Sequence, residues 1–325
     1  MQTIIGNDIY RAKNLLERGE LVAIPTETVY GLAANALNAT AVVKIFEVKN
    51  RPTFNPLIIH CSSWDKVALY VSEIPAKASL LAKAFVPGPI TFLLPKKTII
   101  SDLVTAGSNK VAIRIPNHPL TLQLLHRLGF PLAAPSANQF GYISPTTAAH
   151  VLESLGGKIT YILDGGAANI GVESTIVGFN RQEQVVLYRS GGIGIEAIEK
   201  VLNEKVITAT EIDSLHPETP GQLKSHYAPN TALYTGNIEA MLPDWADKKV
   251  AVISFTGHFQ DVPTQQQFIL SPEGSLLEAA KNLFAALRKI DQLAVDVILA
   301  EIFPNEGIGR AINDRLHRAA AAWKL

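Results

Sequence analysis

The sequence predicts an α/β protein of two domains, and three observations lead to this fold class. The chain has 325 residues, which is long for one hydrophobic core. In the first two hundred residues, short runs rich in β-branched residues alternate with helical patterns. A proline-containing stretch with few apolar residues then precedes a shorter α/β series. We therefore expect a first domain over residues 1–208, a linker over 209–230 and a small second domain over 231–325.

The interleaved elements of the first domain favour a twisted mixed sheet, largely buried, with flanking helices. Strands are expected at residues 21–25, 57–60, 90–94, 111–115, 132–134, 161–163, 175–179 and 185–188, and in the second domain at 249–254 and 294–302. Helices are expected at residues 8–18, 39–49, 76–85, 120–128 and 146–155, and in the second domain at 275–290 and 311–322.

The composition excludes several classes of protein. Hydrophobic residues make up 47% of the chain and charged residues 18%, which is typical of a globular protein and not of a disordered one. The single cysteine, Cys61, excludes an intramolecular disulfide and a cysteine cluster for zinc. No apolar run is long enough to cross a membrane, and the N-terminus lacks the pattern of an export signal. We therefore expect a cytoplasmic protein with no membrane partner.

The net charge is zero but divides unevenly between the two parts of the chain. Residues 1–207 hold 19 Lys and Arg against 15 Asp and Glu, a charge of +4, and the remaining residues hold 10 against 14, a charge of −4. A surplus of +4 is too weak to indicate nucleic-acid binding by itself. It suits a small anion such as a nucleotide, and ordinary scatter of surface charge explains it equally well.

Hydroxyl groups gather where the first predicted strand ends. Residues 25–32 (PTETVYGL) place Thr26, Thr28 and Tyr30 there, and α/β proteins bind ligands at strand ends. A helix cap and turn is an equally good interpretation of this segment.

A second polar group surrounds the strand expected at 57–60. Lys49 and Arg51 lie at the end of a predicted helix, Asn55 follows them, and His60 ends the strand. The two cations complement the dipole at the helix end, which is one explanation for them. Together with Asn55 and His60 they also suit an anion such as a triphosphate or bicarbonate, because Lys supplies a point charge and Arg a bidentate fork.

Arg114 lies among apolar residues of a predicted strand. A charge on a buried strand needs a partner, because burying it unpaired is very costly. Either an internal carboxylate or a bound anion satisfies this requirement, and an internal ion pair is the commoner case.

Small and polar residues follow the strand at 132–134. Ser136, Asn138 and Ser144 offer hydroxyl and amide groups close to a predicted helix start, which is a ready site for phosphate. The familiar P-loop, HExxH, GxSxG and CxxC patterns are absent from the sequence.

In chain order, these segments resemble the YrdC-like domain of threonylcarbamoyl-AMP synthases. The matching segments are PTETVYGL at 25–32, KNRP and NPL at 49–57, the strand with Arg114, PSAN and SPT at 135–146, ESTIV at 173–177, and the segment around Arg189. Residues 220–229 and 309–316 resemble the linker and the closing motif of the two-domain form of this family. The resemblance therefore covers nearly the whole chain and implies a small Rossmann-like C-terminal domain.

The resemblance implies a nucleotidyltransferase that joins L-threonine, bicarbonate and ATP into threonylcarbamoyl-AMP and releases pyrophosphate. Mg²⁺ is expected with the ATP, held mostly by water and phosphate oxygens, with no organic cofactor and no metal site made by the protein. The product is expected to pass to a transferase complex that modifies a tRNA adenosine beside the anticodon.

Residue roles follow from the resemblance at the matching positions. Threonine is expected to contact Thr28, His60, Arg114, Ser174 and the backbone of Ala134, with Arg114 pairing its carboxylate. ATP is expected to contact Arg51, Asn55, Lys110, Ser136, Ser144 and Arg189, with Asn138 nearby. Lys49 and Arg51 are expected to neutralise the reacting phosphate and carbamate, and Tyr227 to act as a lid.

Two other functions compete with this interpretation. The YrdC-like module of hydrogenase-maturation carbamoyltransferases also forms a carbamoyl adenylate, but those chains resemble a fusion with zinc-binding cysteines, and Cys61 is the only cysteine here. An RNA-binding module is disfavoured by the modest charge and by the lack of an aromatic stacking series. Direct binding of tRNA stays open.

Overall fold

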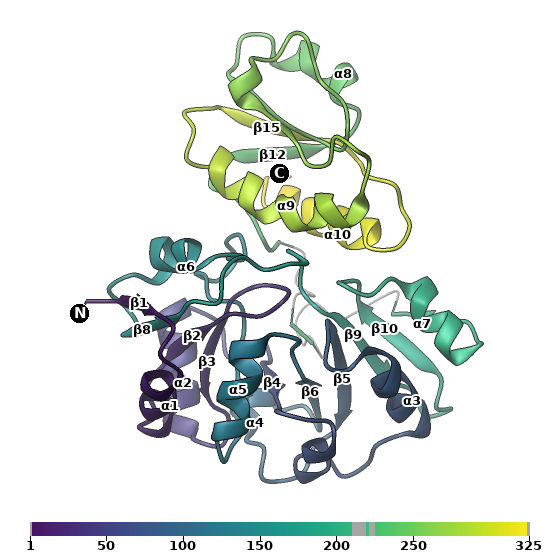
Figure 1. The fold of residues 1–325 in the computed structure, drawn as a ribbon. Coiled ribbons are helices and arrows are strands. Elements are labelled where there is room, and N and C mark those ends of the chain that lie inside the picture. The colour runs from purple at the N-terminus through teal and green to yellow at the C-terminus, as the bar shows by residue number, and fades with distance from the viewer. Residues whose placement is uncertain (1, 210–218, 221–224, 324–325) are drawn as a thin grey trace.

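The computed structural model describes residues 2–209, 219–220 and 225–323 and confirms the α/β fold class (Figure 1). A large mixed sheet forms the N-terminal domain, and a small parallel sheet with its own helices forms the C-terminal domain. The last strand of the large sheet ends at Thr208 and the first strand of the small sheet begins at Ala232. Of the predicted linker, residues 210–218 and 221–224 lie outside the described residues.

Within the described part of the chain, the large sheet has eleven strands in the order β1-β8-β2-β3-β7-β4-β6-β5-β9-β10-β11. Their bounds are β1 Ile4–Gly6, β2 Val22–Ile24, β3 Gly31–Asn35, β4 Ile58–His60, β5 Ile90–Pro95, β6 Lys110–Arg114, β7 Leu132–Ala133, β8 Tyr161–Leu163, β9 Thr175–Phe179, β10 Val185–Arg189 and β11 Ile207–Thr208. Every strand predicted for this domain is present, and β1, β3 and β11 are additional.

Helices flank this sheet. They are α1 Ile9–Glu17, α2 Ala39–Lys49, α3 Ala76–Phe85, α4 Asp102–Thr105, α5 Pro119–Arg127, α6 Ala148–Leu155 and α7 Ile195–Leu202, with a short 3₁₀ helix η1 at Asp65–Leu69. Side chains cap several of them: Asp8 accepts from backbone N–H groups of α1, and Asn38 accepts from one of α2. Such caps satisfy N–H groups that a helix leaves unpaired at its start.

The strand register places three polar side chains next to one another. β4 and β6 run parallel with His60 opposite Arg114, and β5 pairs antiparallel with β6 so that Thr91 also lies opposite Arg114. Neighbouring strands lie about 4.8 Å apart, so these side chains share one edge of the sheet. The apolar strand residues around them form the main core of the domain.

The C-terminal domain is a four-stranded parallel sheet in the order β12-β15-β13-β14. Its elements are β12 Ala232–Thr235, α8 Ile238–Met241, η2 Leu242–Trp245, β13 Val250–Ser254, η3 Thr264–Gln266, β14 Gln267–Ile269, α9 Leu276–Ile290, β15 Val297–Ala300 and α10 Gly309–Ala320. Figure 1 shows α9 and α10 between the small sheet and the N-terminal domain. The predicted helices at 275–290 and 311–322 are confirmed by α9 and α10, with α10 beginning two residues early.

The two domains share an apolar cluster. Val29, Ile143 and Val172 of the N-terminal domain pack in one buried cluster with Phe284 of α9 and Leu316 of α10. Each fully buried side chain of this size contributes about 1.5–3 kcal/mol. The interface is therefore a shared core that fixes the C-terminal domain beside the edge of the large sheet. None of the helices in the described residues is long and apolar enough to cross a membrane.

Candidate active site

A small cavity lies where the large sheet meets the linker and the C-terminal domain. Its volume is about 50 Å³. Eight predicted residues line it, seven of them assigned to substrates (Arg51, His60, Arg114, Ala134, Ser136, Ser174 and Arg189) and one, Tyr227, assigned as a lid. Further lining comes from Thr26, Val29, Gly31, Ile58, Pro135, Glu173, Pro220 and His226. The fold thus brings segments far apart in the sequence to one place.

The strand directions explain this convergence. His60, Arg114 and Arg189 are the last residues of β4, β6 and β10, whose carboxyl ends meet at the same edge of the sheet. Ser174 immediately precedes β9, which runs antiparallel to β10 and so begins at this edge. Ligands of α/β proteins characteristically bind outside the carboxyl ends of strands.

Arg114 has an internal carboxylate partner, Glu27, in the segment after β2. Its Nη2 lies 2.8 Å from Oε1 of Glu27, and both side chains are about 5% exposed. The hydroxyl of the next residue, Thr28, is hydrogen-bonded at 2.8 Å to the hydroxyl of Thr26, which lines the cavity. Sequence reasoning left open whether a carboxylate or a bound anion balances Arg114. The structure provides the carboxylate, and Glu27 was not among the predicted site residues.

Lys49 supports the loop after β7 from behind. It lies at the end of α2, is 1% exposed, and donates hydrogen bonds to the carbonyl oxygens of Ser136 (2.6 Å) and Asn138. Burial, and secondly the nearby Arg51, lower the pKa of the Lys49 ammonium well below its ordinary value. An anion in the cavity would restore the charged form, because opposite charge favours ionisation.

Arg51 is held by its own loop. Its Nη2 donates to the side-chain oxygen of Asn55 (2.7 Å) and to the carbonyl of Pro56 (2.8 Å), and its Nε donates to the carbonyl of Asn55 (3.2 Å). The turn is possible because Asn50 caps α2 in the left-handed region at φ 51°. Asn55 therefore orients Arg51 and does not itself line the cavity.

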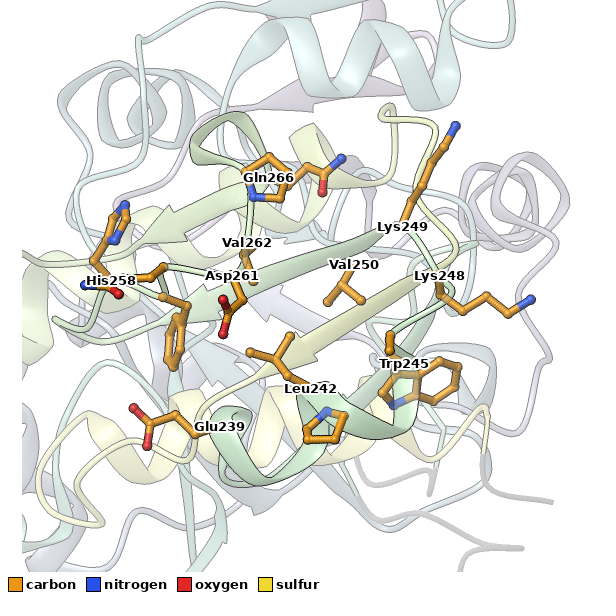
Figure 2. Close-up of a pocket in the computed structure, with 15 residues that line it drawn as sticks. Glu239, Leu242, Trp245, Lys248, Lys249, Val250, His258, Asp261, Val262 and Gln266 are labelled. Carbon is orange, nitrogen blue, oxygen red and sulfur yellow. The ribbon is translucent and has the colours of Figure 1, made fainter.

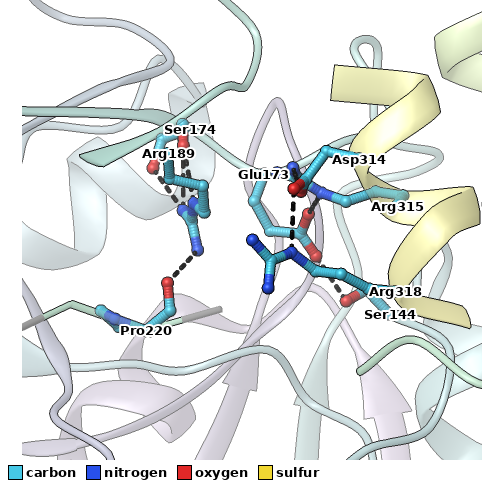
Figure 3. A network of polar contacts seen from close by, with 8 residues as sticks. All are labelled: Ser144, Glu173, Ser174, Arg189, Pro220, Asp314, Arg315 and Arg318. Atoms are coloured by element: carbon cyan, nitrogen blue, oxygen red, sulfur yellow. Dashed lines mark hydrogen bonds and ion pairs between the residues drawn. The ribbon is translucent and has the colours of Figure 1, made fainter. Parts of the chain in front are cut away.

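Glu173 links the remaining polar groups (Figure 3). One carboxylate oxygen accepts a hydrogen bond from the hydroxyl of Ser144 (2.6 Å), and the other lies 2.8 Å from Nε of Arg315 in α10. Burial alone would raise the pKa of Glu173, but the guanidiniums of Arg315 and Arg189 lower it below its ordinary value. Glu173 belongs to the ESTIV motif and Arg315 to the closing motif, yet neither residue was singled out from the sequence.

Arg189 spans the cavity from β10. It donates from Nε and Nη2 to the carbonyl of Ser174 (3.1 and 2.9 Å) and from Nη1 to the carbonyl of Pro220 (3.2 Å). It therefore joins the edge of the sheet to the linker.

The described end of the linker covers the cavity. Tyr227 is 1% exposed, stacks on Phe284 of α9 with ring centres 5.6 Å apart, and has a positive φ of 63°. His226 packs edge-on against Phe140 and Tyr227. A positive φ is rare for a bulky residue and is often found at functional sites.

Six predicted residues do not line the cavity. Thr28, Lys49, Asn55, Asn138 and Ser144 are buried directly behind it and contact its lining or the loops that carry it. Lys110 lies at the other end of β6, four residues or about 13 Å from Arg114, with its ammonium 5.9 Å from the ring centre of Tyr188. The structure thus does not bring Lys110 to this cavity.

The charges and the unpaired polar atoms of the site suit an anionic ligand. Among the described residues in and around the cavity, four arginines (Arg51, Arg114, Arg189 and Arg315) face three carboxylates (Glu27, Glu173 and Asp314), a surplus of one positive charge, and Lys49 adds a second when it is protonated. Several buried atoms have no hydrogen-bond partner in the described chain: Nδ1 of His60 and His226, Nδ2 of Asn55, Nε of Arg114 and Oδ1 of Asn138. Buried polar groups of this kind are normally satisfied, so their concentration here indicates a ligand site.

A second cavity lies elsewhere, in the C-terminal domain. Its volume is about 860 Å³, and it is bounded by the segment from α8 to η2 and by the loop between β13 and β14, with Trp245 and Phe259 among its lining (Figure 2). None of the predicted site residues lines it. In the described residues, no three His, Cys, Asp or Glu side chains form a group that could hold a metal ion.

Comparison with known proteins agrees with this arrangement over both domains. Residues 14–191 match the family described as "Telomere recombination", and residues 193–321 match the C-terminal domain of threonylcarbamoyl-AMP synthase. Proteins named threonylcarbamoyl-AMP synthase from Pyrococcus abyssi and Bacillus subtilis are each 41% identical to this chain. The alignments cover 95% and 96% of this chain and 93% and 92% of the relatives.

Solved structures give the same result. A crystal structure of P. abyssi Sua5 complexed with L-threonine matches with a TM-score of 0.88 at 40% identity and covers 98% of both chains. Full-length HypF in a phosphate- and nucleotide-bound form matches with a TM-score of 0.51 at 21% identity, covering 57% of this chain and 30% of that one, which shows the fold alone. On sequence, domain order and fold, this chain belongs to the threonylcarbamoyl-AMP synthase family in its two-domain form.

Proposed function

We propose that this protein forms threonylcarbamoyl-AMP from L-threonine, bicarbonate and MgATP and releases pyrophosphate. The observation that carries the proposal is the cavity in which Arg51, Arg114 and Arg189 converge with Ser136 and Ser174. It combines a surplus of positive charge with hydroxyl groups, which is what a nucleotide beside a small amino acid requires.

Threonine is assigned to the Arg114 side of the cavity. The guanidinium of Arg114 pairs with the threonine carboxylate and keeps Glu27 as its second partner. His60, Thr28, Ser174 and the backbone of Ala134 surround the rest of the amino acid. The relative crystallised with L-threonine supports threonine as the substrate.

ATP is assigned to the side formed by Arg51, Ser136 and Arg189. Asn55, Asn138 and Ser144 lie directly behind the lining. They support the nucleotide site by holding the loops and side chains that form it. Lys49 and Arg51 neutralise charge on the reacting phosphate and carbamate. Arg51 does so from the cavity wall, and Lys49 from behind the loop whose carbonyl oxygens accept its hydrogen bonds.

The reaction has two bond-forming steps. The threonine amine and bicarbonate give a carbamate with loss of water, and a carbamate oxygen then bonds to the α-phosphorus. The bond from that phosphorus to the bridging oxygen breaks, and pyrophosphate leaves. Phosphoryl-transfer chemistry of this kind depends on positioning and positive charge more than on a protein nucleophile.

Mg²⁺ enters as part of the MgATP substrate. The only carboxylates described beside the cavity, Glu27 and Glu173, are already paired with Arg114 and Arg315. The donor set therefore fits a metal ion ligated by phosphate oxygens and water, as Mg²⁺ usually is with nucleotides.

The linker acts as a lid. A cavity of about 50 Å³ holds only a few waters, whereas ligand sites of this class measure about 300–1,000 Å³. His226 and Tyr227 line this small space, so we expect them to move when a nucleotide enters and to close over the bound substrates. We further propose that the reaction takes place in the cytoplasm and supplies a tRNA-modifying transferase complex.

The proposal is tested by incubating the full-length protein with MgATP, bicarbonate and a panel of amino acids while pyrophosphate is measured. Release that depends on both threonine and bicarbonate is expected, with the adenylate identified by mass spectrometry. Release independent of any amino acid would contradict the proposal. A gel shift with RNA, on the same preparation, tests the competing RNA-binding function.

A further inference from the structure

Among the described residues of the C-terminal domain, Arg315 in α10 forms an ion pair with a residue that lines the cavity. Arg315 is 0% exposed. Its Nε lies 2.8 Å from Glu173 of the N-terminal domain, and its Nη1 lies 2.7 Å from Asp314 (Figure 3). Its guanidinium carbon lies 5.2 Å from the ring centre of Tyr227. One guanidinium thus contacts both domains and the lid.

Glu173, the partner of Arg315, lines the cavity and lies next to two residues assigned to ATP, Ser144 and Arg189. Its second oxygen accepts the Ser144 hydroxyl hydrogen, and a serine hydroxyl has only one hydrogen to donate. The carbonyl of the next residue, Ser174, receives two hydrogen bonds from Arg189. The position of Glu173 therefore determines where the Ser144 hydroxyl points, and its charge acts on the nearby Arg189. Both residues are assigned to ATP.

We propose, resting on the function proposed above, that Arg315 is a positioning residue of the nucleotide site: it neutralises Glu173 and fixes the carboxylate that orients Ser144. The C-terminal domain then takes part in catalysis through this side chain, in addition to covering the sheet.

Electrostatics gives the reason. A buried carboxylate that lines a triphosphate site repels its ligand unless a cation balances it, and the repulsion is strong because little water screens it. Arg189 lies nearby, but its described hydrogen bonds go to Ser174 and Pro220 and none goes to Glu173. Removal of Arg315 leaves Glu173 without its ion pair and frees it to turn from Ser144.

A second cross-domain ion pair on α10 provides a matched control. Arg310 contacts Glu196 of α7, and these side chains are 35% and 48% exposed. Exposed pairs contribute little, because water screens them. Both pairs join α10 to the N-terminal domain, but only the Arg315 pair touches the cavity.

The test is calorimetric titration of the full-length protein with MgATP in the absence of threonine. Arg315→Met is expected to weaken binding roughly 10- to 100-fold at pH 8. The loss is expected to shrink as the pH falls toward 6, because a Glu173 freed from Arg315 takes up a proton more easily and stops repelling the nucleotide. Arg310→Met is expected to bind within about twofold of the wild type.

The double variant Glu173→Gln with Arg315→Met separates charge from packing. Removing both charges of a buried pair is far milder than removing one, so binding is expected to return to within about threefold of the wild type and to follow the wild-type dependence on pH. A purely structural role predicts no such recovery. If Arg315→Met does not fold, the double variant is compared with Glu173→Gln alone, and a tenfold difference between them overturns the proposal.

The outcomes distinguish the two proposals. Wild-type protein that binds MgATP without threonine-dependent pyrophosphate release overturns the proposed function only. Unchanged MgATP binding by Arg315→Met overturns the positioning role only. Wild-type protein that does not bind MgATP at all overturns both.

Discussion

Nη2 of Arg114 lies 2.8 Å from Oε1 of Glu27, and the two side chains are almost completely buried. Apart from this ion-pair contact, Nε of Arg114 and Oε2 of Glu27 have no hydrogen-bond partner among the described residues. A buried ion pair needs additional hydrogen bonds to offset its desolvation. A bound amino acid supplies part of them, because its carboxylate accepts from Arg114.

Arg114→Ala is expected to abolish threonine-dependent pyrophosphate release while leaving MgATP binding within about threefold of the wild type. Removing one partner of a buried charge pair costs about 2–5 kcal/mol, which corresponds to a loss of roughly 30-fold to several thousand-fold in kcat/KM for threonine. Pyrophosphate release and MgATP titration are measured on the same preparation. Equal loss of both activities would contradict a role in carboxylate binding.

Glu27→Gln is the companion variant. It leaves Arg114 buried without its countercharge and is expected to lower the free energy of unfolding by about 3–5 kcal/mol. Threonine is expected to raise the melting temperature of this variant more than that of the wild type, because the substrate carboxylate replaces the missing charge. A smaller shift with threonine than in the wild type would count against this pairing.

The sequence predicted the strands and helices that carry strong periodicity, but missed elements without it. β3, Gly31–Asn35, has the sequence GLAAN, which contains no β-branched residue, and it is a strand because β2 and β7 pair with both of its edges. Tertiary context, not local propensity, decides such a segment.

The site was predicted in part, for a similar reason. Motif residues at strand ends, such as His60 and Arg114, could be found because each follows its own apolar run. The partners Glu27 and Arg315 could not, since Glu27 is 87 positions before Arg114 and Arg315 is 142 positions after Glu173. Only the folded sheet and the docked α10 bring these charges together. Lys110 was assigned to ATP from the resemblance alone, although the strand predicted at 111–115 already placed it at the opposite end from Arg114.

Tyr227→Ala is expected to lower pyrophosphate release at least tenfold, because the lid loses the ring that packs on Phe284 and Arg315. The control is Tyr234→Ala, which removes a ring that pairs with Trp245 in the C-terminal domain. Circular dichroism verifies that both variants fold.

Removal of residues 209–325 is also expected to impair turnover, because the linker residues that cover the cavity are then missing. Full activity of a 1–208 fragment would contradict the role of the linker as a lid.

The free energy of unfolding is expected to fall as the pH drops from 7 to 5. Burial, with a contribution from Arg114, lowers the pKa of His60 to about 3, and burial likewise lowers that of His226 to about 3. On unfolding, each imidazole regains its ordinary pKa of about 6.5 and, below that pH, binds a proton that it does not bind in the folded protein. Stability is therefore complete above pH 6.5 and declines below it by about 1.4 kcal/mol per pH unit for each histidine.

Urea unfolding at several pH values measures this slope. His226→Asn is expected to reduce it by about 1.4 kcal/mol per pH unit, and His258→Asn, which replaces an exposed histidine, is expected to leave it unchanged. Equal slopes in wild type and His226→Asn would show that the buried ring does not titrate as described.

Binding of MgATP is expected to take up a proton at Lys49. In the free protein, burial and then Arg51 lower the pKa of this ammonium well below its ordinary value, and the phosphates favour its charged form. Lys49 thus has a lower pKa in the free protein than in the complex. At a pH between these two values, MgATP binding is accompanied by uptake of a proton, so the affinity for MgATP falls as the pH rises. Titration calorimetry in buffers of different ionisation enthalpy counts the protons. Lys49→Met is expected to abolish the uptake, whereas Lys44→Met on the same helix, which removes a half-buried pair with Glu20, should retain it. Uptake that persists in Lys49→Met would assign the proton to another group.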